Sequence, residues 1–238
     1  MGRSLVFQGG TCLRFCHNLK RYSEDLDFSL ERREARYSFE KLHQGVLLDL
    51  SRQGYEVSGS ASADKVVQKA FVRVAGLPGQ FGFSMPKDQK LAIKLEVDVR
   101  PPNGGGVETY FVSRWGELFP VLQYDLPTLL AGKILAILFR PYDRGRDYYD
   151  LIWFLGRHIK ANMAYLKSGW IQHSKSSQGM PQRWDEALSK VSKKVKKISP
   201  AALLKDLRPF LEDPADAAWI EKYPDVYQQL LQDARRHE

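Results

Sequence analysis

The sequence predicts a mixed α/β (α+β) fold, in which a strand-rich first half carries a mixed sheet and the second half is helical. Two observations predict it. Up to about residue 112, short runs of β-branched and aromatic residues alternate with turn residues. From residue 126 onward, apolar residues recur at helical spacing. We place the boundary in a loop at 116–124, which predicts one domain at 1–120 and a second at 121–238.

The elements follow from local patterns, taken in chain order. A short apolar strand at 5–7 leads into a helix that opens with Gly-Gly-Thr, and a strand carrying Asp-x-Asp begins near residue 25. An amphipathic helix at 34–53 ends before Gly54. Further strands are predicted at 66–74, 80–84, 92–99 and 107–112. Further helices are predicted at 126–139, 146–156, 159–171, 183–197, 200–211 and from about 224.

Composition limits the function classes. The 238 residues include 36 Lys and Arg against 28 Asp and Glu, a formal charge of +8, which favours a polyanionic partner such as RNA or DNA. No apolar run is long enough to span a membrane and no signal peptide is evident, so we expect a cytoplasmic protein without membrane contact. Cys12 and Cys16 lie one helical turn apart without zinc-type spacing to histidine, which predicts buried free thiols.

Asp25 and Asp27 form the first candidate site. Side chains alternate along a strand, so both carboxylates are expected on one face, while Leu26 and Phe28 point into the core. Two carboxylates held that close repel each other unless one is protonated or a cation lies between them, and an oxygen-only pair suits Mg²⁺ or Mn²⁺. The alternative is a solvated strand edge.

Gly9, Gly10 and Thr11 form the second candidate site, at the start of a helix. Glycines let backbone N–H groups approach a phosphate closely, and the N-terminus of a helix favours an anion. A plain turn before a helix is the alternative.

The segment 91–100 supplies further carboxylates. Strict alternation puts Lys94, Glu96 and Asp98 on one face of the strand and apolar residues on the other. The charged face is therefore predicted to be either catalytic or a simple solvated edge.

Lys133 is the single charge in the apolar helix at 126–139. Burying an unpaired ammonium is unfavourable by several kcal/mol, so an anionic partner is expected. Two partners stay open: a salt bridge to Asp147 or Asp150, which share a helix face, or a phosphate of a bound nucleotide with one of those carboxylates orienting the lysine. A capping role at the helix start is a further alternative for Asp147.

A run of lysines crowds the segment 189–198. Its two interpretations are a solvated helix face and a surface that follows a nucleic-acid backbone. The lysines are Lys190, Lys193, Lys194, Lys196 and Lys197.

The order strand, Gly-Gly-Thr, helix and Asp-x-Asp strand resembles the core of the DNA polymerase β-like nucleotidyltransferases. More narrowly, Phe-Gln-Gly-Gly-Thr-Cys-Leu-Arg at 7–14 and Arg-Tyr-Ser-Glu-Asp-Leu-Asp-Phe at 21–28 resemble the AbiEii/AbiGii toxin family. Leu-Ala-Gly-Lys-Ile-Leu-Ala at 130–136 and Arg-Asp-Tyr-Tyr-Asp-Leu at 146–151 match that family's helical motifs. Its members are toxins of type IV toxin–antitoxin and phage-defence systems.

This resemblance implies a polymerase β-like core followed by a helical half, with a nucleotide bound between them. The implied metal ligands are Asp25, Asp27 and Glu96, with Asp98 as the second choice for the third carboxylate. The implied catalytic residues are Asp25, Asp27, Glu96, Lys133 and Asp147. The implied nucleotide contacts are Gly9, Gly10, Thr11, Ser23, Lys133 and Arg146.

We therefore expect a Mg²⁺- or Mn²⁺-dependent enzyme that transfers NMP from an NTP to RNA and releases pyrophosphate. If family behaviour carries over, the acceptor is a tRNA 3′ end and a separately encoded antitoxin restrains the activity. Two alternatives remain: the same chemistry on a hydroxyl of a protein or small molecule, and a nucleic-acid-binding protein that has kept the fold without catalysis.

Overall fold

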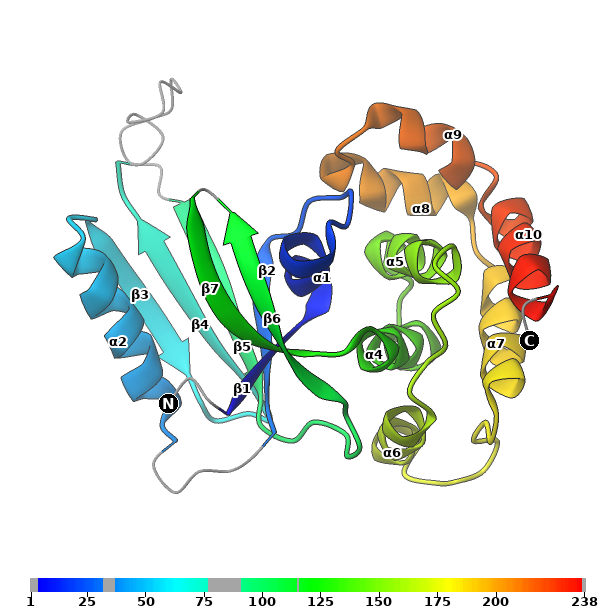
Figure 1. The fold of residues 1–238 in the computed structure, drawn as a ribbon, viewed down its shortest axis with the longest axis horizontal. Helices are drawn as coiled ribbons and strands as arrows, with labels where there is room; N and C mark the ends of the chain where they lie inside the picture. The colour runs from blue at the N-terminus through cyan, green and yellow to red at the C-terminus, as the bar shows by residue number, and fades with distance from the viewer. Residues whose placement is uncertain (1–3, 32–36, 77–90, 115, 237–238) are drawn as a thin grey trace. The chain divides into compact units, whose positions relative to one another are not determined.

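The computed structural model of the chain describes residues 4–31, 37–76, 91–114 and 116–236 (Figure 1). The strand predicted at 80–84 and the first residues of the helix predicted at 34–53 lie outside them. The chain divides into two compact units. Unit 1 consists of Met1–Cys12 and Glu24–Pro101, and unit 2 of Leu13–Ser23 and Pro102–Glu238. The domain boundary placed near residue 120 stays a prediction.

Unit 1 is built on strands with one long helix. Its elements are β1 (Leu5–Gln8), the start of α1 (Gly9–His17), β2 (Asp25–Leu30), α2 (Phe39–Arg52), β3 (Val57–Ser62), β4 (Val67–Val74) and β5 (Leu91–Asp98). The strands lie side by side in the order β3-β4-β5-β2-β1 (Figure 1). The pair β2–β5 is parallel and the other neighbouring pairs are antiparallel.

The core of unit 1 lies between α2 and one face of these strands. Leu30, Ala70, Leu95 and Val97 on the strands pack with Phe39, the first residue of α2. The helix begins there because the side chain of the preceding residue, a serine, accepts a hydrogen bond from a backbone N–H of the first turn. The opposite face of the sheet carries the alternate, charged side chains of β2 and β5.

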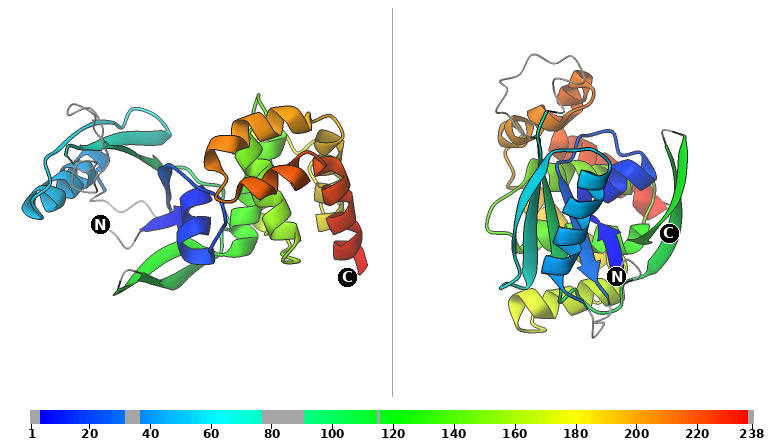
Figure 2. Two further views of the ribbon diagram at one scale, coloured as in Figure 1. Left: turned by 90° about the horizontal axis from the view of Figure 1, so that it is seen from above. Right: turned by 90° about the vertical axis from the view of Figure 1, so that its left-hand side faces the viewer.

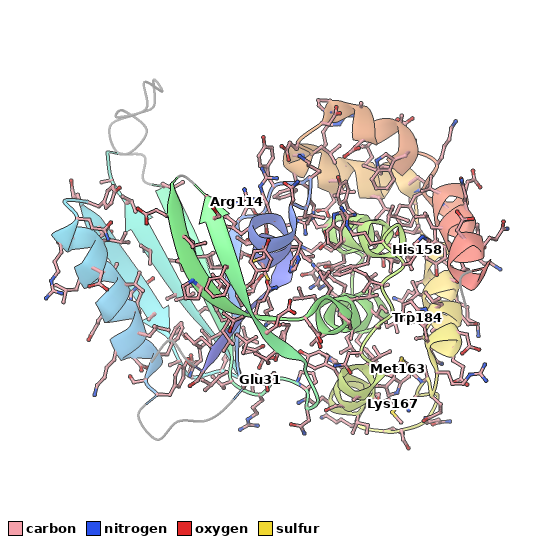
Figure 3. All side chains as sticks on the ribbon, viewed as in Figure 1. Glu31, Arg114, His158, Met163, Lys167 and Trp184 are labelled. Atoms are coloured by element: carbon pink, nitrogen blue, oxygen red, sulfur yellow. The ribbon has the colours of Figure 1, made fainter. Side chains whose placement is uncertain are left out.

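Unit 2 combines a hairpin with helices. Its elements are β6 (Val107–Arg114), β7 (Glu117–Tyr124), α4 (Leu126–Phe139), α5 (Gly145–Leu155), α6 (Met163–Ser174), α7 (Trp184–Val195), α8 (Pro200–Leu207), the 3-10 turns Arg208–Phe210 and Pro214–Asp216, α9 (Ala217–Ile220) and α10 (Tyr223–Arg236). Helix α4 packs against α5, α6 and α7, and α5 also contacts α8 and α10 (Figures 1 and 2). Side chains fill the space between these helices (Figure 3).

The predicted mixed α/β class is confirmed, and the helix predicted at 126–139 has the bounds of α4. Two strands were missed. The loop predicted at 116–124 is wrong, because β7 occupies it and pairs antiparallel with β6 along its full length, Pro120 included. Strand β3 has a sequence of small polar residues and owes its conformation to its pairing with β4.

Two smaller expectations also have outcomes. Cys12 and Cys16 are buried free thiols, as predicted. In the part of the chain that the structure describes, no helix is both long enough and apolar enough to cross a membrane.

Candidate functional site

Unit 1 brings three of the predicted carboxylates onto one face of its sheet. The parallel register of β2 and β5 pairs Asp25 with Lys94 and Asp27 with Glu96. Paired residues on neighbouring strands project from the same face. The four side chains therefore form two adjacent rows, each with one aspartate from β2.

Two lysines offset part of the negative charge of this carboxylate face. Lys94 Nζ lies 2.7 Å from Glu96 Oε1 and 3.5 Å from Asp25 Oδ2, and Lys69 Nζ lies 3.0 Å from Glu96 Oε1. Burial alone would raise the pKa of Glu96, but hydrogen bonds and charge from Lys94 and Lys69 outweigh it and lower that pKa. Burial alone would lower the pKa of Lys94, but Glu96 and Asp25 outweigh it and raise it. Glu96 is thus held ionised at neutral pH.

Helix α1 begins beside Asp27. Gly9 has φ +78°, and a Cβ there would overlap the Asp27 carboxylate, so only glycine fits this turn without a shift. Thr11 donates its hydroxyl hydrogen to the backbone carbonyl of Asp25, which ties α1 to β2. The predicted phosphate contact of Thr11 therefore depends on its backbone N–H, which like that of Gly10 belongs to the first turn and lacks a partner within the helix.

The predicted metal ligands on this face offer carboxylate oxygens, the donors that Mg²⁺ prefers. Among the residues that the structure describes, no three His, Cys, Asp or Glu side chains converge as a complete metal site. Mg²⁺, however, is commonly held by one or two carboxylates together with substrate phosphates. Asp25 and Asp27 offer such a pair, and the Lys94 ammonium already places positive charge between Asp25 and Glu96.

Glu96 and Asp98 differ in their surroundings. Glu96 is the direct partner of Asp27, whereas Asp98 lies one row further along and is paired with Ser29. An Asp98 carboxylate oxygen also accepts a hydrogen bond from the backbone N–H of Arg100 at 2.9 Å, which closes the turn after β5.

A buried charge cluster in unit 2 contains Lys133 and both predicted aspartates. Lys133 Nζ lies 2.7 Å from Asp150 Oδ2 and 3.1 Å from Asp147 Oδ1. Arg21 Nε and Nη2 donate to the two carboxylate oxygens of Asp150, both at 2.7 Å, and Arg140 pairs with Asp147. The salt bridge that the sequence left open for Lys133 is therefore present to both aspartates.

Mutual attraction shifts the pKa values of Asp150, Lys133 and Arg21 toward their charged forms. Burial would raise the pKa of Asp150, but Arg21 and Lys133 outweigh it and lower that pKa. Burial would lower the pKa of Lys133, but Asp150 and Asp147 outweigh it and raise it. The pKa of Arg21 is raised in the same way, since Asp150 outweighs its burial. The cluster thus holds three cations against two carboxylates.

Two further predicted nucleotide contacts also lie in unit 2. The guanidinium carbon of Arg146 lies 4.0 Å from the centroid of the Phe210 ring, so this arginine packs on an aromatic face. Ser23 is half-buried in the segment that precedes β2. Roles for Arg146 and Ser23 in nucleotide binding stay predictions.

The predicted lysine run borders a hollow of about 450 Å³. Lys190, Lys193, Lys194 and Lys197 line it together with Trp170, and Lys190 Nζ lies 5.0 Å from the centroid of a Trp170 ring. Within the described part of the chain, none of these lysines forms an ion pair, although an Asp143 carboxylate also borders the hollow. Unpaired like charges gathered around one hollow repel, so this surface favours an anionic partner.

Sequence reasoning missed two charged residues. Arg21 lies in the matched 21–28 segment, but nothing near it in the sequence indicates that Asp150 is its partner. Lys69 could have been found from β4, where Lys69, Phe71 and Arg73 alternate with apolar residues as Lys94 and Glu96 do on β5.

Comparison with known proteins gives a family and a fold. A family model described as "Nucleotidyl transferase AbiEii toxin, Type IV TA system" matches residues 2–234. The crystal structure of JHP933 from Helicobacter pylori is similar, at 17% identity over 98% of this chain and 86% of that chain, with a TM-score of 0.56. A second H. pylori structure, of a candidate nucleotidyltransferase, is similar at 19% identity over 99% of this chain and 89% of that chain, with a TM-score of 0.52. No curated protein matches the sequence.

Proposed function

The chain belongs to the AbiEii family of nucleotidyltransferase toxins from type IV toxin–antitoxin systems, and from that premise we propose that it transfers NMP from an NTP to a hydroxyl of RNA. The acceptor oxygen attacks the α-phosphorus, the bond to pyrophosphate breaks, and the hydroxyl proton passes to a carboxylate. The observation that supports this chemistry most is the carboxylate face of β2 and β5 directly beside the start of α1.

In this proposal Asp25 and Asp27 hold Mg²⁺ or Mn²⁺, with Glu96 as the third carboxylate. The ion would neutralise the triphosphate and make the acceptor hydroxyl more acidic. Glu96 is preferred over Asp98 because it is the direct partner of Asp27 on the neighbouring strand. As a carboxylate, Glu96 can accept the hydroxyl proton.

The triphosphate would bind at the N-terminus of α1. Backbone N–H groups of Gly10 and Thr11 are placed to donate to phosphate oxygens there, and the helix dipole adds to the attraction. Gly9 lets the chain turn into the helix without displacing the Asp27 carboxylate. For Lys133 and Asp147, the assignment to nucleotide phosphates stays a prediction, because each already has a partner in the buried charge cluster.

RNA is the acceptor that the charge distribution favours. The formal charge is +8, and unpaired lysines of α7 and of the turn after it line a hollow beside Trp170. Cations beside an aromatic ring suit a backbone of phosphates with bases that stack. The family resemblance adds a tRNA 3′ end as the specific acceptor and a separately encoded antitoxin as the protein that restrains it.

The test is label transfer from each of the four α-³²P-labelled NTPs in Mg²⁺ or Mn²⁺. The acceptors offered are purified tRNA, total cell RNA and RNA-free protein extract. The proposal expects label in nuclease-sensitive material, greatest with tRNA, and none after chelation of the metal. Label that resists nuclease and is removed by protease would assign a protein acceptor, and RNA binding without any label would assign a protein that has lost catalysis.

A further inference from the structure

We infer that Phe71 is a stacking platform for a base of the RNA acceptor close to its reacting 3′ end. This inference rests on the proposed RNA acceptor and assigns to it a binding surface on unit 1. The inference is based on the position of Phe71, which lies in the same row of paired residues as Lys94 and Asp25. Ser60, Phe71, Lys94 and Asp25 are successive partners across β3, β4, β5 and β2.

The neighbouring row confirms that β4 contributes to the same face. Ser62, Lys69, Glu96 and Asp27 are successive partners across the same strands, and the ion pair between Lys69 and Glu96 spans β4 and β5 at 3.0 Å. The carboxylate face therefore continues without interruption onto β4 and β3. Neighbouring strands lie about 4.8 Å apart, so the Phe71 and Asp25 backbones are about 10 Å from each other.

Phe71 is exposed on the face of the sheet opposite the core of unit 1. The residue is 36% exposed, whereas Ala70 and Val72, its neighbours in the chain, point to the opposite face and are buried. That opposite face is covered by α2, whose His43 Nε2 lies 3.2 Å from the Phe71 carbonyl oxygen. The Phe71 ring is therefore not part of the core of unit 1, and it lies on the same face of the sheet as Asp25 and Glu96.

Cations surround this ring. The guanidinium carbon of Arg73 lies 5.5 Å from the ring centroid, and Lys69 and Lys94 occupy adjoining positions on β4 and β5. A hollow of about 410 Å³ lies at the same place, lined by Phe71 and Lys69 together with Lys65. Among the described residues that line this hollow, Asp64 is the single acid. It accepts a hydrogen bond from a serine hydroxyl.

An exposed ring with cations on both sides along one strand fits a single-stranded nucleic acid. Bases stack on the ring whatever their identity, while the flanking cations contact phosphates. A distance of about 10 Å corresponds to about three stacked nucleotides, at about 3.4 Å each, or to fewer extended ones. The base on Phe71 would therefore be the second or third from the acceptor hydroxyl. Lys69 and Lys94 are paired with Glu96 and Asp25, but among the described residues Arg73 and Lys65 form no ion pair, and this unpaired positive charge favours a polyanion over a protein partner.

The test places the fluorescent base 2-aminopurine at the second, third or eighth position from the 3′ end of a single-stranded RNA 12-mer. Binding to the wild-type protein should quench the second or third position and leave the eighth unchanged. Phe71→Ala should abolish that quenching and weaken RNA affinity roughly tenfold, the scale of one lost base stack. Phe71→Trp, which keeps an aromatic ring at this position, should keep both the quenching and the RNA affinity of the wild type. Phe111→Ala removes an exposed phenylalanine of β6 and should change neither.

NTP affinity, measured in the same proteins, shows whether Phe71 stacks on a base of the RNA or on the base of the incoming nucleotide. The inference expects it to stay within about twofold in Phe71→Ala. If NTP affinity falls and RNA affinity does not, Phe71 stacks the base of the incoming nucleotide and the inference is wrong. RNA affinity and quenching that survive in Phe71→Ala also overturn it, and leave this face to a protein partner.

RNA binding and quenching can be measured without turnover. They therefore distinguish failure of the proposed RNA acceptor from failure of the Phe71 platform. If the wild-type protein binds no RNA, the proposed RNA acceptor fails and the platform fails with it. If the wild-type protein binds and labels RNA but Phe71→Ala behaves identically, the platform alone fails. Arg73→Gln provides an independent check, since loss of one phosphate contact should reduce the slope of log affinity against log salt by about 0.7.

Discussion

Arg21 and Asp150 form a two-pronged ion pair within unit 2, with both N–O distances 2.7 Å and side chains that are 1% and 0% exposed. The pair joins the segment before β2 to helix α5. Such burial is tolerated only because both carboxylate oxygens accept hydrogen bonds from the guanidinium and Lys133 adds a second cation.

Replacing Arg21 with methionine should lower the free energy of unfolding by about 3 kcal/mol, because one cation lost from a buried pair leaves the carboxylate under-compensated. Urea unfolding followed by circular dichroism measures the change. The matched control is Arg183→Met, which breaks an exposed ion pair with Asp185 and should lose less than about 1 kcal/mol. Equal effects of the two changes would refute a structural role for the buried pair.

The stabilisation by Asp150 should depend on pH in a defined direction. Its pKa is lowered in the folded protein, so the unfolded chain takes up its proton first as the pH falls. The contribution is then complete above the unfolded value of about 3.9 and is lost as the pH falls further. The difference in unfolding free energy between wild type and Asp150→Asn should be constant from about pH 5 to 7 and shrink below about pH 4. A difference in unfolding free energy that shrinks between pH 7 and 5 would contradict a lowered pKa of Asp150 in the folded protein.

Lys133→Met separates two roles of this lysine. Asp147 and Asp150 each keep an arginine, so the structural loss should be modest, about 1–3 kcal/mol. If Lys133 also binds a nucleotide phosphate, turnover per folded molecule should fall far more than the folded fraction does. Labelled-NTP assays on protein whose folded fraction is known measure this, with the exposed Lys205→Met as control. Normal turnover in the folded fraction would reduce Lys133 to a structural residue.

The lysines of α7 and of the turn after it should contribute to RNA affinity through salt-dependent contacts. Replacing Lys190, Lys193, Lys194 and Lys197 with glutamine should weaken binding similarly across sequences and flatten the slope of log affinity against log salt by up to about 3. NTP binding should be unaffected. The control replaces exposed lysines elsewhere, namely Lys41, Lys175, Lys205 and Lys222. An unchanged slope in the α7 variant would mean that this surface is only solvated.

The sequence predicted those parts of the fold that local patterns determine. Helix α4 could be read from an apolar run that starts after a capping aspartate, and β5 from the alternation of Lys94 and Glu96 with apolar residues. Strands β3 and β7 could not, because small residues in one and a proline in the other hide strands that exist through their pairing with β4 and β6.

For the candidate site the same distinction holds. The spacing of Asp25 and Asp27 placed both on one face of a strand, but spacing cannot give the register that sets Asp27 beside Glu96. The partnership of Arg21 with Asp150 spans 129 positions of the chain and is visible only in three dimensions.

The most direct test of the proposed chemistry compares Asp27→Asn with the wild type in transfer of α-³²P label from NTP to RNA. The change keeps the shape of the side chain and removes the charge beside the start of α1. Asp49→Asn, on the exposed side of α2, is the control. We predict at least about a 100-fold loss of transfer in Asp27→Asn, the scale on which loss of one electrostatic contact affects catalysis. Its melting temperature should stay near normal, and Asp49→Asn should transfer at the wild-type rate. Wild-type transfer by Asp27→Asn would contradict the assignment of the carboxylate face as the catalytic site.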